Sequence, residues 1–86
     1  MDEILDGSPA HSAGILDQDE LLQFGYVTAS TTDALNSIPG VVRDHVNQRI
    51  NITVRRKGTL MNLELIPKTW GGRGLLGCHL TKISQM

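Results

Sequence analysis

Residues 50–67 read Ile-Asn-Ile-Thr-Val-Arg-Arg-Lys-Gly-Thr-Leu-Met-Asn-Leu-Glu-Leu-Ile-Pro, and this stretch decides the fold class. Isoleucine and valine alternate with polar residues over its first five positions, as residues of a half-buried β-strand do. Gly58 can adopt the positive φ of a hairpin turn, so residues 60–66 are expected to return as the partner strand. The stretch therefore predicts an antiparallel β-hairpin.

A short helix and two further strands are predicted on the amino-terminal side of this hairpin. Ser8 can cap the helix, Pro9 suits its first position, and Gly14 can end it in the left-handed conformation. Residues 3–5 before the helix and the apolar residues 21–27 after it are expected to be strands.

A second, longer helix is predicted between that strand and the hairpin, because apolar residues recur there with helical spacing. An interior proline loses a hydrogen bond and clashes with the preceding turn. Pro39 is therefore expected to divide the region into a short turn at 33–37 and a helix from Pro39 to about Asn47. A glycine-rich loop at 70–78 then leads into a final strand at 79–83. Together these elements predict a small, strand-rich α+β domain with one principal helix.

The composition is that of one small globular domain. The chain has 86 residues, which fold to a radius of about 12 Å. Its 40% hydrophobic and 20% charged residues exclude a disordered chain, and no apolar run approaches the roughly 20 residues of a membrane span. The single cysteine, Cys78, excludes an internal disulfide and favours a reducing compartment. Because Met1 almost directly precedes a predicted strand, the chain is expected to be a fragment of a longer protein.

Charge is unevenly divided along the sequence. Residues 1–43 carry seven acidic side chains and one basic one, whereas residues 44–86 carry two acidic and seven basic ones. The net charge of −1 lacks the basic excess of most nucleic-acid-binding proteins. Either the fold interleaves the two halves, or the second half presents a positive surface to an anionic partner group.

Four glycines fall within seven residues of the loop at 70–78, and this density needs a physical reason. A phosphate-binding loop is followed by a helix whose amino terminus holds the anion, but here a strand is expected to follow. Such a loop can instead direct successive backbone N–H groups at one carboxylate, and an extended peptide can then pair with the strand beginning at Cys78. A plain glycine-rich turn without a ligand is the alternative.

Two motifs resemble known families. Residues 7–15, Gly-Ser-Pro-Ala-His-Ser-Ala-Gly-Ile, followed by Asp-Glu-Leu-Leu at 19–22, resemble the signature of PDZ domains. Residues 70–78, Trp-Gly-Gly-Arg-Gly-Leu-Leu-Gly-Cys, resemble PDZ-like domains in which the carboxylate loop lies at the carboxyl end, as in the Golgi reassembly stacking proteins. With residues 50–58 and 63–67, they look most like the 26S proteasome non-ATPase regulatory subunit 9 family.

The resemblance implies a single PDZ-like domain over residues 1–86. It would be a circularly permuted, partly open antiparallel β-barrel or sandwich of five to six strands with two helices. By this resemblance, residues 75–78, Leu-Leu-Gly-Cys, take the place of the Gly-Leu-Gly-Phe pattern that binds a terminal carboxylate in PDZ domains. Leu75 replaces the first glycine of that pattern, and Cys78 replaces its phenylalanine. The implied carboxylate-binding residues are Leu75, Leu76, Gly77, Cys78 and Arg73. The peptide-binding strand and pocket would use Leu76, Cys78, Leu80 and Lys82, and the groove helix Val42, Arg43 and Val46.

The same resemblance implies a function. The chain would bind the carboxyl-terminal tail of a partner protein by β-strand addition, within a chaperone that assembles the base of the proteasome regulatory particle. The implied partner is the tail of an AAA+ ATPase subunit, subunit 6A in that family, and the implied location is the cytoplasm and nucleus. We expect a monomeric domain without enzyme activity, cofactor, metal, nucleic-acid partner or membrane partner.

Other functions stay open from the sequence. A tethering module of the Golgi-stacking kind or the regulatory PDZ domain of a serine protease would bind tails through the same loop, whereas a purely structural module would bind none. A Cys–His nucleophile is not expected, because Cys78 and His79 are neighbours on a predicted strand and point to opposite faces. The three histidines, His11, His45 and His79, are too widely spread to predict a metal site.

Overall fold

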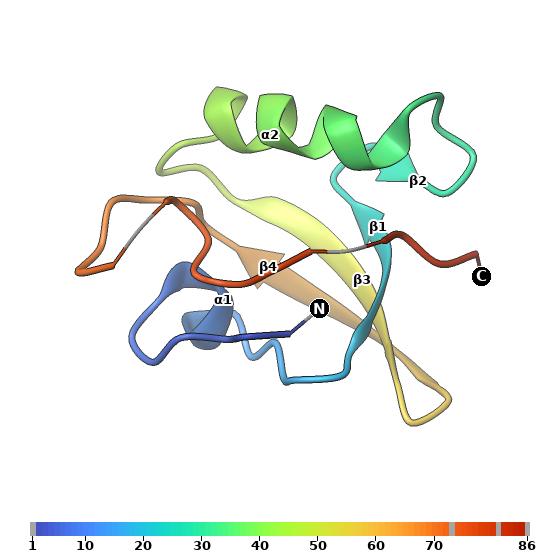
Figure 1. Ribbon diagram of the computed structural model, residues 1–86, viewed down its shortest axis with the longest axis horizontal. Helices are drawn as coiled ribbons and strands as arrows, with labels where there is room; N and C mark the ends of the chain where they lie inside the picture. The colour runs from blue at the N-terminus through green and yellow to red at the C-terminus, as the bar shows by residue number, and fades with distance from the viewer. Residues whose placement is uncertain (1, 73, 81, 86) are drawn as a thin grey trace.

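The computed structural model describes residues 2–72, 74–80 and 82–85. Its elements follow in the order α1 (Pro9–Ser12), β1 (Glu20–Phe24), β2 (Val27–Thr28), α2 (Ala34–Asp44), β3 (Ile50–Arg56) and β4 (Thr59–Leu65). The four strands form one antiparallel sheet in the order β2-β1-β3-β4 (Figure 1). The fold is thus α+β, as the sequence predicts, and its radius of gyration is 11.7 Å. Neither described helix is long and apolar enough to cross a lipid bilayer.

The β3–β4 hairpin lies where the sequence predicts it. Arg56 pairs with Thr59 at its tip, and Lys57 and Gly58 between them both have positive φ, of 50° and 81°. Two left-handed residues in a two-residue turn match the twist of the paired strands. The alternating apolar residues of β3 face the core, where each is at most 2% exposed.

The apolar stretch 21–27, expected to be one strand, is divided into β1 and the two-residue β2. Gly25 turns the chain at a φ of 61°, a value that glycine adopts without steric cost. The register shifts between Leu21 and Gln23, which is a β-bulge. Because the bulge inserts one residue, the neighbouring Leu21 and Leu22 are both buried instead of facing opposite sides of the sheet.

Helix α1 begins as predicted. The Ser8 Oγ accepts a hydrogen bond from the His11 N–H at 3.1 Å, Pro9 occupies the first helical position, and Gly14 follows the helix with a φ of 87°. The hydroxyl satisfies one of the N–H groups that a helix start leaves without a partner.

Helix α2 corrects the prediction of a break at Pro39. One continuous helix runs through the proline and ends at Asp44, before the predicted end at Asn47. Ile38, Val41 and Val42 have helical spacing and are buried. Helices in proteins are stabilised mainly by packing of an apolar face, so this burial outweighs the local cost of the proline.

The strands predicted at 3–5 and 79–83 are reduced to a single antiparallel bridge between Asp2 and His79. The described residues therefore form four strands instead of five to six, and Thr81 lies outside them. Figure 1 shows the carboxyl-terminal segment passing between α2 and the amino-terminal segment. An open sheet of this kind is compatible with a partly open barrel, and the permuted PDZ connectivity stays a prediction.

The acidic first half and the basic second half of the chain are interleaved in the fold, which is the first of the two interpretations of the charge distribution given above. Where β1 begins beside the end of β3, Arg56 binds Asp19 and Arg55 binds Glu20, each pair with a nitrogen–oxygen distance of 2.7 Å. These pairs place acidic side chains of the first half against basic side chains of the second.

Candidate functional site

Three successive carbonyl groups of the glycine-rich loop point into the domain. Each accepts a hydrogen bond from a backbone N–H: Leu75 from Lys68 at 3.3 Å, Leu76 from Ala10 at 2.8 Å, and Gly77 from Leu5 at 2.9 Å. The described peptide bonds are trans, so a carbonyl and the N–H that follows it point in opposite directions. The N–H groups of Leu76, Gly77 and Cys78 therefore point away from the segments that hold the carbonyls.

None of these three N–H groups donates a hydrogen bond to any described residue. Gly77, the middle residue of the three, turns the chain with a φ of 77°. A Cβ atom there would approach the Ser8 Oγ to 2.6 Å and the Trp70 ring to 2.9 Å, so only glycine fits. Successive N–H groups gathered in a turn form a concavity that attracts an anion.

The chain after the loop has one bonded edge and one free edge. The His79 N–H donates to the Asp2 carbonyl at 2.9 Å, and the Asp2 N–H donates to the His79 carbonyl at 3.1 Å. Peptide planarity then turns the Cys78 carbonyl and the Leu80 N–H to the opposite edge. Neither has a hydrogen-bond partner among the described residues, so this edge can pair with an added strand.

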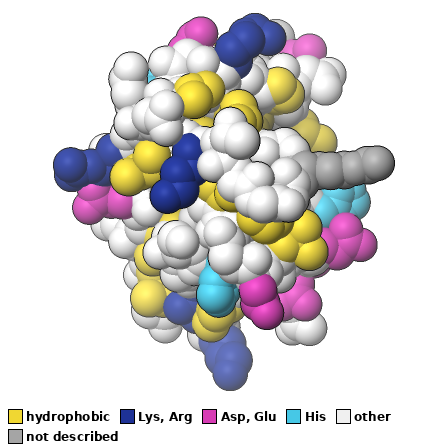
Figure 2. Space-filling view, turned by 90° about the vertical axis from the view of Figure 1, so that its left-hand side faces the viewer, with side chains coloured by type: hydrophobic (Ala, Val, Ile, Leu, Met, Phe, Trp, Pro, Cys, Tyr) yellow, Lys and Arg dark blue, Asp and Glu magenta, His cyan; other side chains and the backbone are white. Residues whose placement is uncertain are grey.

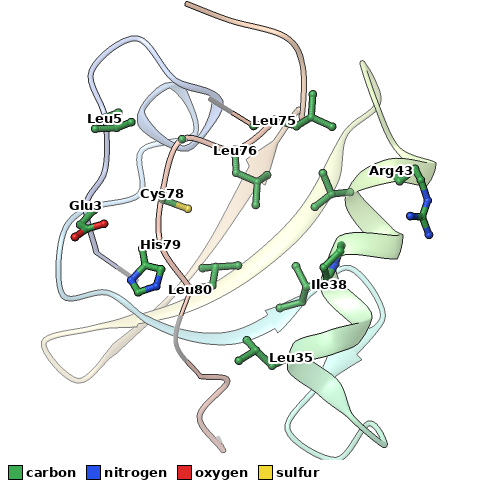
Figure 3. A pocket seen from close by; sticks show the side chains of 14 residues that line it. Glu3, Leu5, Leu35, Ile38, Arg43, Leu75, Leu76, Cys78, His79 and Leu80 are labelled. Carbon is green, nitrogen blue, oxygen red and sulfur yellow. The ribbon is translucent and has the colours of Figure 1, made fainter. Parts of the chain in front are cut away.

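A groove of about 690 Å³ lies along this free edge, between residues 74–80 and α2. Its walls are mainly aliphatic, and Figure 3 shows that side chains from both walls point into it. The main contributors are Leu35, Ile38 and Val42 from the helix, and Leu76, Cys78 and Leu80 from the opposite segment. Figure 2, which faces the end of the molecule where the loop lies, shows exposed hydrophobic side chains with charges of both signs around them.

Most of the predicted site residues line this groove, namely Leu75, Leu76, Gly77, Cys78, Leu80, Val42 and Arg43. Val46 and Lys82 are not among its lining residues. Val46 follows the end of α2 and so lies beyond the helix that forms the wall. Arg73, predicted as a carboxylate-binding cation, lies outside the described residues. The roles assigned to these residues stay predictions.

Sequence reasoning missed the first half of the helical wall. Leu35 and Ile38 line the groove, but the sequence predicts a principal helix that begins only at Pro39. The spacing of Leu35, Ile38 and Val42 at i, i+3 and i+7 is the signal that identifies one helix face. The amino-terminal residues Glu3 and Leu5 were also missed, because they reach the groove only through the bridge to His79.

The Cys78 thiol contributes an apolar surface to the groove. Burial raises its pKa to about 11, so the thiol is protonated near neutral pH. A neutral thiol is a weak nucleophile and packs as a small hydrophobic group.

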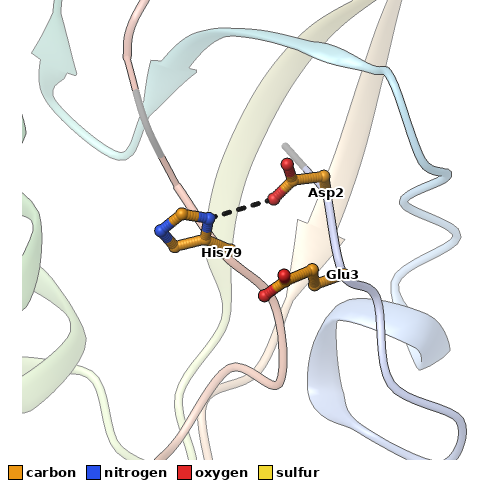
Figure 4. Close-up of side chains that lie close together, drawn as sticks. All are labelled: Asp2, Glu3 and His79. Carbon is orange, nitrogen blue, oxygen red and sulfur yellow. Dashed lines mark hydrogen bonds and ion pairs between the residues drawn. The ribbon is translucent and has the colours of Figure 1, made fainter.

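Asp2, Glu3 and His79 gather outside the apolar part of the groove (Figure 4). The His79 Nδ1 lies 3.2 Å from the Asp2 Oδ1, and one ligand atom from each of the three residues lies within 4.8 Å of the others. All three are exposed, and exposed acidic groups at this spacing are common in proteins that bind no metal.

Comparison with known proteins finds relatives over nearly the whole chain. The human 26S proteasome non-ATPase regulatory subunit 9 is 36% identical over 85 residues, which make up 99% of this chain and 38% of the human protein. The Drosophila melanogaster protein of the same name is 39% identical over 74 residues, 85% of this chain and 34% of that protein. The chain is homologous to one part of the 26S proteasome non-ATPase regulatory subunit 9 family.

A relative of the chain is also found in yeast, so the homology extends across distantly related eukaryotes. The Saccharomyces cerevisiae protein, named a probable 26S proteasome regulatory subunit p27, is 33% identical over 82 residues, 94% of this chain and 37% of its own length. No family model matches the chain. The chain spans well under half the length of each of these three relatives. The resemblance to the subunit 9 family inferred from residues 50–58, 63–67 and 70–78 is confirmed.

Proposed function

We propose that the chain binds the carboxyl-terminal tail of a partner protein by β-strand addition. The observation that carries this proposal is that three unpartnered N–H groups, a free strand edge and an aliphatic groove lie together among the described residues. The terminal carboxylate accepts hydrogen bonds from Leu76, Gly77 and Cys78. The last side chain enters the groove, and the residues before it pair with the Cys78 carbonyl and the Leu80 N–H.

The expected affinity is modest. Burial of one terminal leucine or phenylalanine side chain contributes about 2–3 kcal/mol. Charge-assisted hydrogen bonds to the carboxylate add about 1.5–3 kcal/mol. Ordering a flexible tail costs several kcal/mol, so the dissociation constant is expected to be of micromolar order or weaker.

The names of the relatives support a proteasomal partner. We propose that the groove holds the tail of a proteasomal AAA+ ATPase subunit, namely subunit 6A. The chain would then be the PDZ-like module of a chaperone for the regulatory particle base, acting in the cytoplasm and nucleus. A tail bound in the groove is masked, because the same residues cannot dock on the proteolytic core at the same time.

Tail binding is tested by titrating the 86-residue chain with a decapeptide that ends in a free leucine carboxylate, and with the same peptide amidated. NMR chemical shifts are expected to change most at residues 76–80 and along α2. Loss of the carboxylate is expected to weaken binding by about 10-fold or more, given the strength of charge-assisted hydrogen bonds. Equal binding of the two peptides, or binding of neither, refutes the proposal.

A pair of matched variants locates the bound peptide. Leu35 lines the groove and is 38% exposed, whereas Leu60 lies at the distant hairpin and is 56% exposed. Leu35→Lys places a charge in the apolar wall and is expected to abolish detectable binding. Leu60→Lys is expected to leave binding unchanged, since it adds the same charge elsewhere.

The proteasomal part of the proposal needs a separate experiment. Tail peptides of the proteasomal AAA+ ATPase subunits are compared for binding, and the strongest binding is expected from subunit 6A. The chain is then added to an assay in which that tail docks on the proteolytic core. Docking that is unaffected by saturating amounts of the chain rules out masking.

A further inference from the structure

The geometry of the free edge fixes which residue of the chain faces each position of a bound tail, and this step rests on the proposed function. With the carboxylate at the loop, an antiparallel tail places its last residue opposite Cys78, its penultimate residue opposite His79, and the residue before that opposite Leu80. The backbone groups of His79 are bonded to Asp2 on the other edge. The penultimate residue and His79 therefore form a non-hydrogen-bonded pair, in which side chains approach most closely, with Cα atoms about 4.5 Å apart.

The penultimate side chain shares a face with His79, which lines the groove beside Glu3, and not with the side chains of Cys78 and Leu80. Neighbouring strand residues point to opposite faces, so the last residue and the third-last residue face the groove while the penultimate residue faces outward. The imidazole of His79 lies beside this position, and the carboxylates of Asp2 and Glu3 lie on the far side of His79, close to its ring (Figure 4).

Both carboxylates lie beside His79 because of the backbone at Glu3. In a regular extended segment, neighbouring side chains point to opposite faces. Glu3 has a φ of 52°, a left-handed value, and its carboxylate lies within 4.8 Å of the His79 ring, while the Asp2 Oδ1 lies 3.2 Å from the His79 Nδ1. A bound tail and the amino-terminal segment would lie on the two sides of the chain at His79, so two strand spacings, about 10 Å, separate them. An extended lysine or arginine side chain of the tail and a carboxylate that faces it can together span this distance.

We infer that the chain selects tails with lysine or arginine at the penultimate position and discriminates against aspartate or glutamate there. Opposite charges attract and like charges repel over such a distance, which is about one Debye length at 0.1 M ionic strength. The terminal carboxylate is common to all tails, so its hydrogen bonds to the loop contribute to the binding of each. The side chain at the penultimate position differs between tails and therefore sets which of them binds more tightly.

The inference is tested with three free-carboxylate decapeptides that share a terminal leucine and differ only at the penultimate residue, which is lysine, glutamine or glutamate. Dissociation constants are measured at pH 7.5 in 50 mM and 500 mM NaCl. The lysine peptide is expected to bind about 5-fold more tightly than the glutamate peptide at low salt, since exposed ion pairs are individually weak. The ratio is expected to fall toward about 2-fold at high salt, because salt screens exposed charges.

Variants assign the preference to the two carboxylates. Asp2→Asn combined with Glu3→Gln is expected to bring the ratio to about 1, and Asp2→Asn combined with Glu3→Lys is expected to favour the glutamate peptide. Asp17→Asn combined with Glu64→Gln removes the same two charges from exposed positions outside the lining of the groove and is expected to keep the preference. A preference that survives in the first variant, or is lost in the control, overturns the inference.

The two proposals fail in different ways. If the three peptides bind equally well and their amidated forms bind weakly, the charge selection is wrong while tail binding stands. If no peptide with a free carboxylate binds, the proposed function fails, and the selection fails with it.

Discussion

Asp19 is the charged side chain that the described part of the fold buries most completely, with 2% of its surface exposed. It accepts hydrogen bonds from the Arg56 guanidinium at 2.7 and 2.8 Å and from the Leu16 N–H at 2.9 Å. Burial by itself raises the pKa of the Asp19 carboxyl, but these hydrogen bonds outweigh burial and hold the pKa below its usual value. The same Arg56 side chain donates to the Gly14 carbonyl, so the group ties the loop after α1 to β3.

Asp19→Asn is expected to lower the free energy of unfolding at pH 7 by about 2 kcal/mol, because it weakens the hydrogen bonds to Arg56. A carboxyl whose pKa is lower in the folded state stabilises the fold above its unfolded pKa of about 3.9 and loses that effect as pH falls through the folded value. Urea denaturation at pH 7 and pH 3 checks both points. The variant should lose less stability than the natural chain between these pH values, and an equal loss would contradict this role of Asp19.

Gly77→Ala is expected to destabilise the fold by about 2–3 kcal/mol, since the new methyl group overlaps Ser8 and Trp70 and the φ is left-handed. Chemical denaturation measures the change. Gly71→Ala is the matched control: nothing lies within 4 Å of its Cβ position and it has no positive φ, so its effect should stay within about 0.5 kcal/mol. Similar effects at the two positions would contradict the tight packing at Gly77.

At the scale of elements, α2 shows tertiary packing overriding a local preference. Pro39 cannot donate a hydrogen bond to the preceding turn, yet the helix continues on both sides of it. The buried residues at 38, 41 and 42 hold the helix on the core, and the residues at 35, 38 and 39 form the groove wall. A broken helix would leave that wall incomplete.

Pro39→Ala is expected to raise the free energy of unfolding by about 1 kcal/mol or more, because alanine restores a backbone donor and is far more favourable inside a helix. The measurement is urea denaturation together with far-ultraviolet circular dichroism, which should show no loss of helix. A less stable variant would show that the proline ring contributes more through its contacts than it costs in the helix.

At the scale of the whole molecule, the candidate site is made of segments that are distant in the sequence. The amino-terminal residues bind the backbone of the loop and of His79, and α2 supplies the facing wall. Figure 1 shows the carboxyl-terminal segment held between these two parts. A bound tail would contact both sides and would therefore stabilise the whole fold.

A tail peptide is expected to raise the thermal stability of the domain. At a free concentration 100 times its dissociation constant, a ligand that binds only the folded state adds about 2.7 kcal/mol to the free energy of unfolding. For a domain of this size, this corresponds to a rise in Tm of about 10 °C or more, measured by calorimetry. The amidated peptide at the same concentration should give a much smaller rise. A rise that is equal for both peptides would contradict recognition of the carboxylate.

The sequence by itself determined the local elements. The alternation in residues 50–56, the turn at Lys57–Gly58 and the cap at Ser8 depend on neighbouring residues only, and the structure has all three. The resemblance to the subunit 9 family is likewise a property of the sequence, and relatives that match nearly the whole chain confirm it.

Tertiary structure alone decided which backbone groups stay free and which side chains face them. The loop N–H groups point away from the segments that bind the intervening carbonyls, and no local sequence pattern predicts those bonds. Continuity of α2 through Pro39 and the arrival of Glu3 beside His79 have the same cause. Each of these features depends on contacts between residues far apart in the chain. The free energy of those contacts outweighs the local conformational preferences of the residues involved.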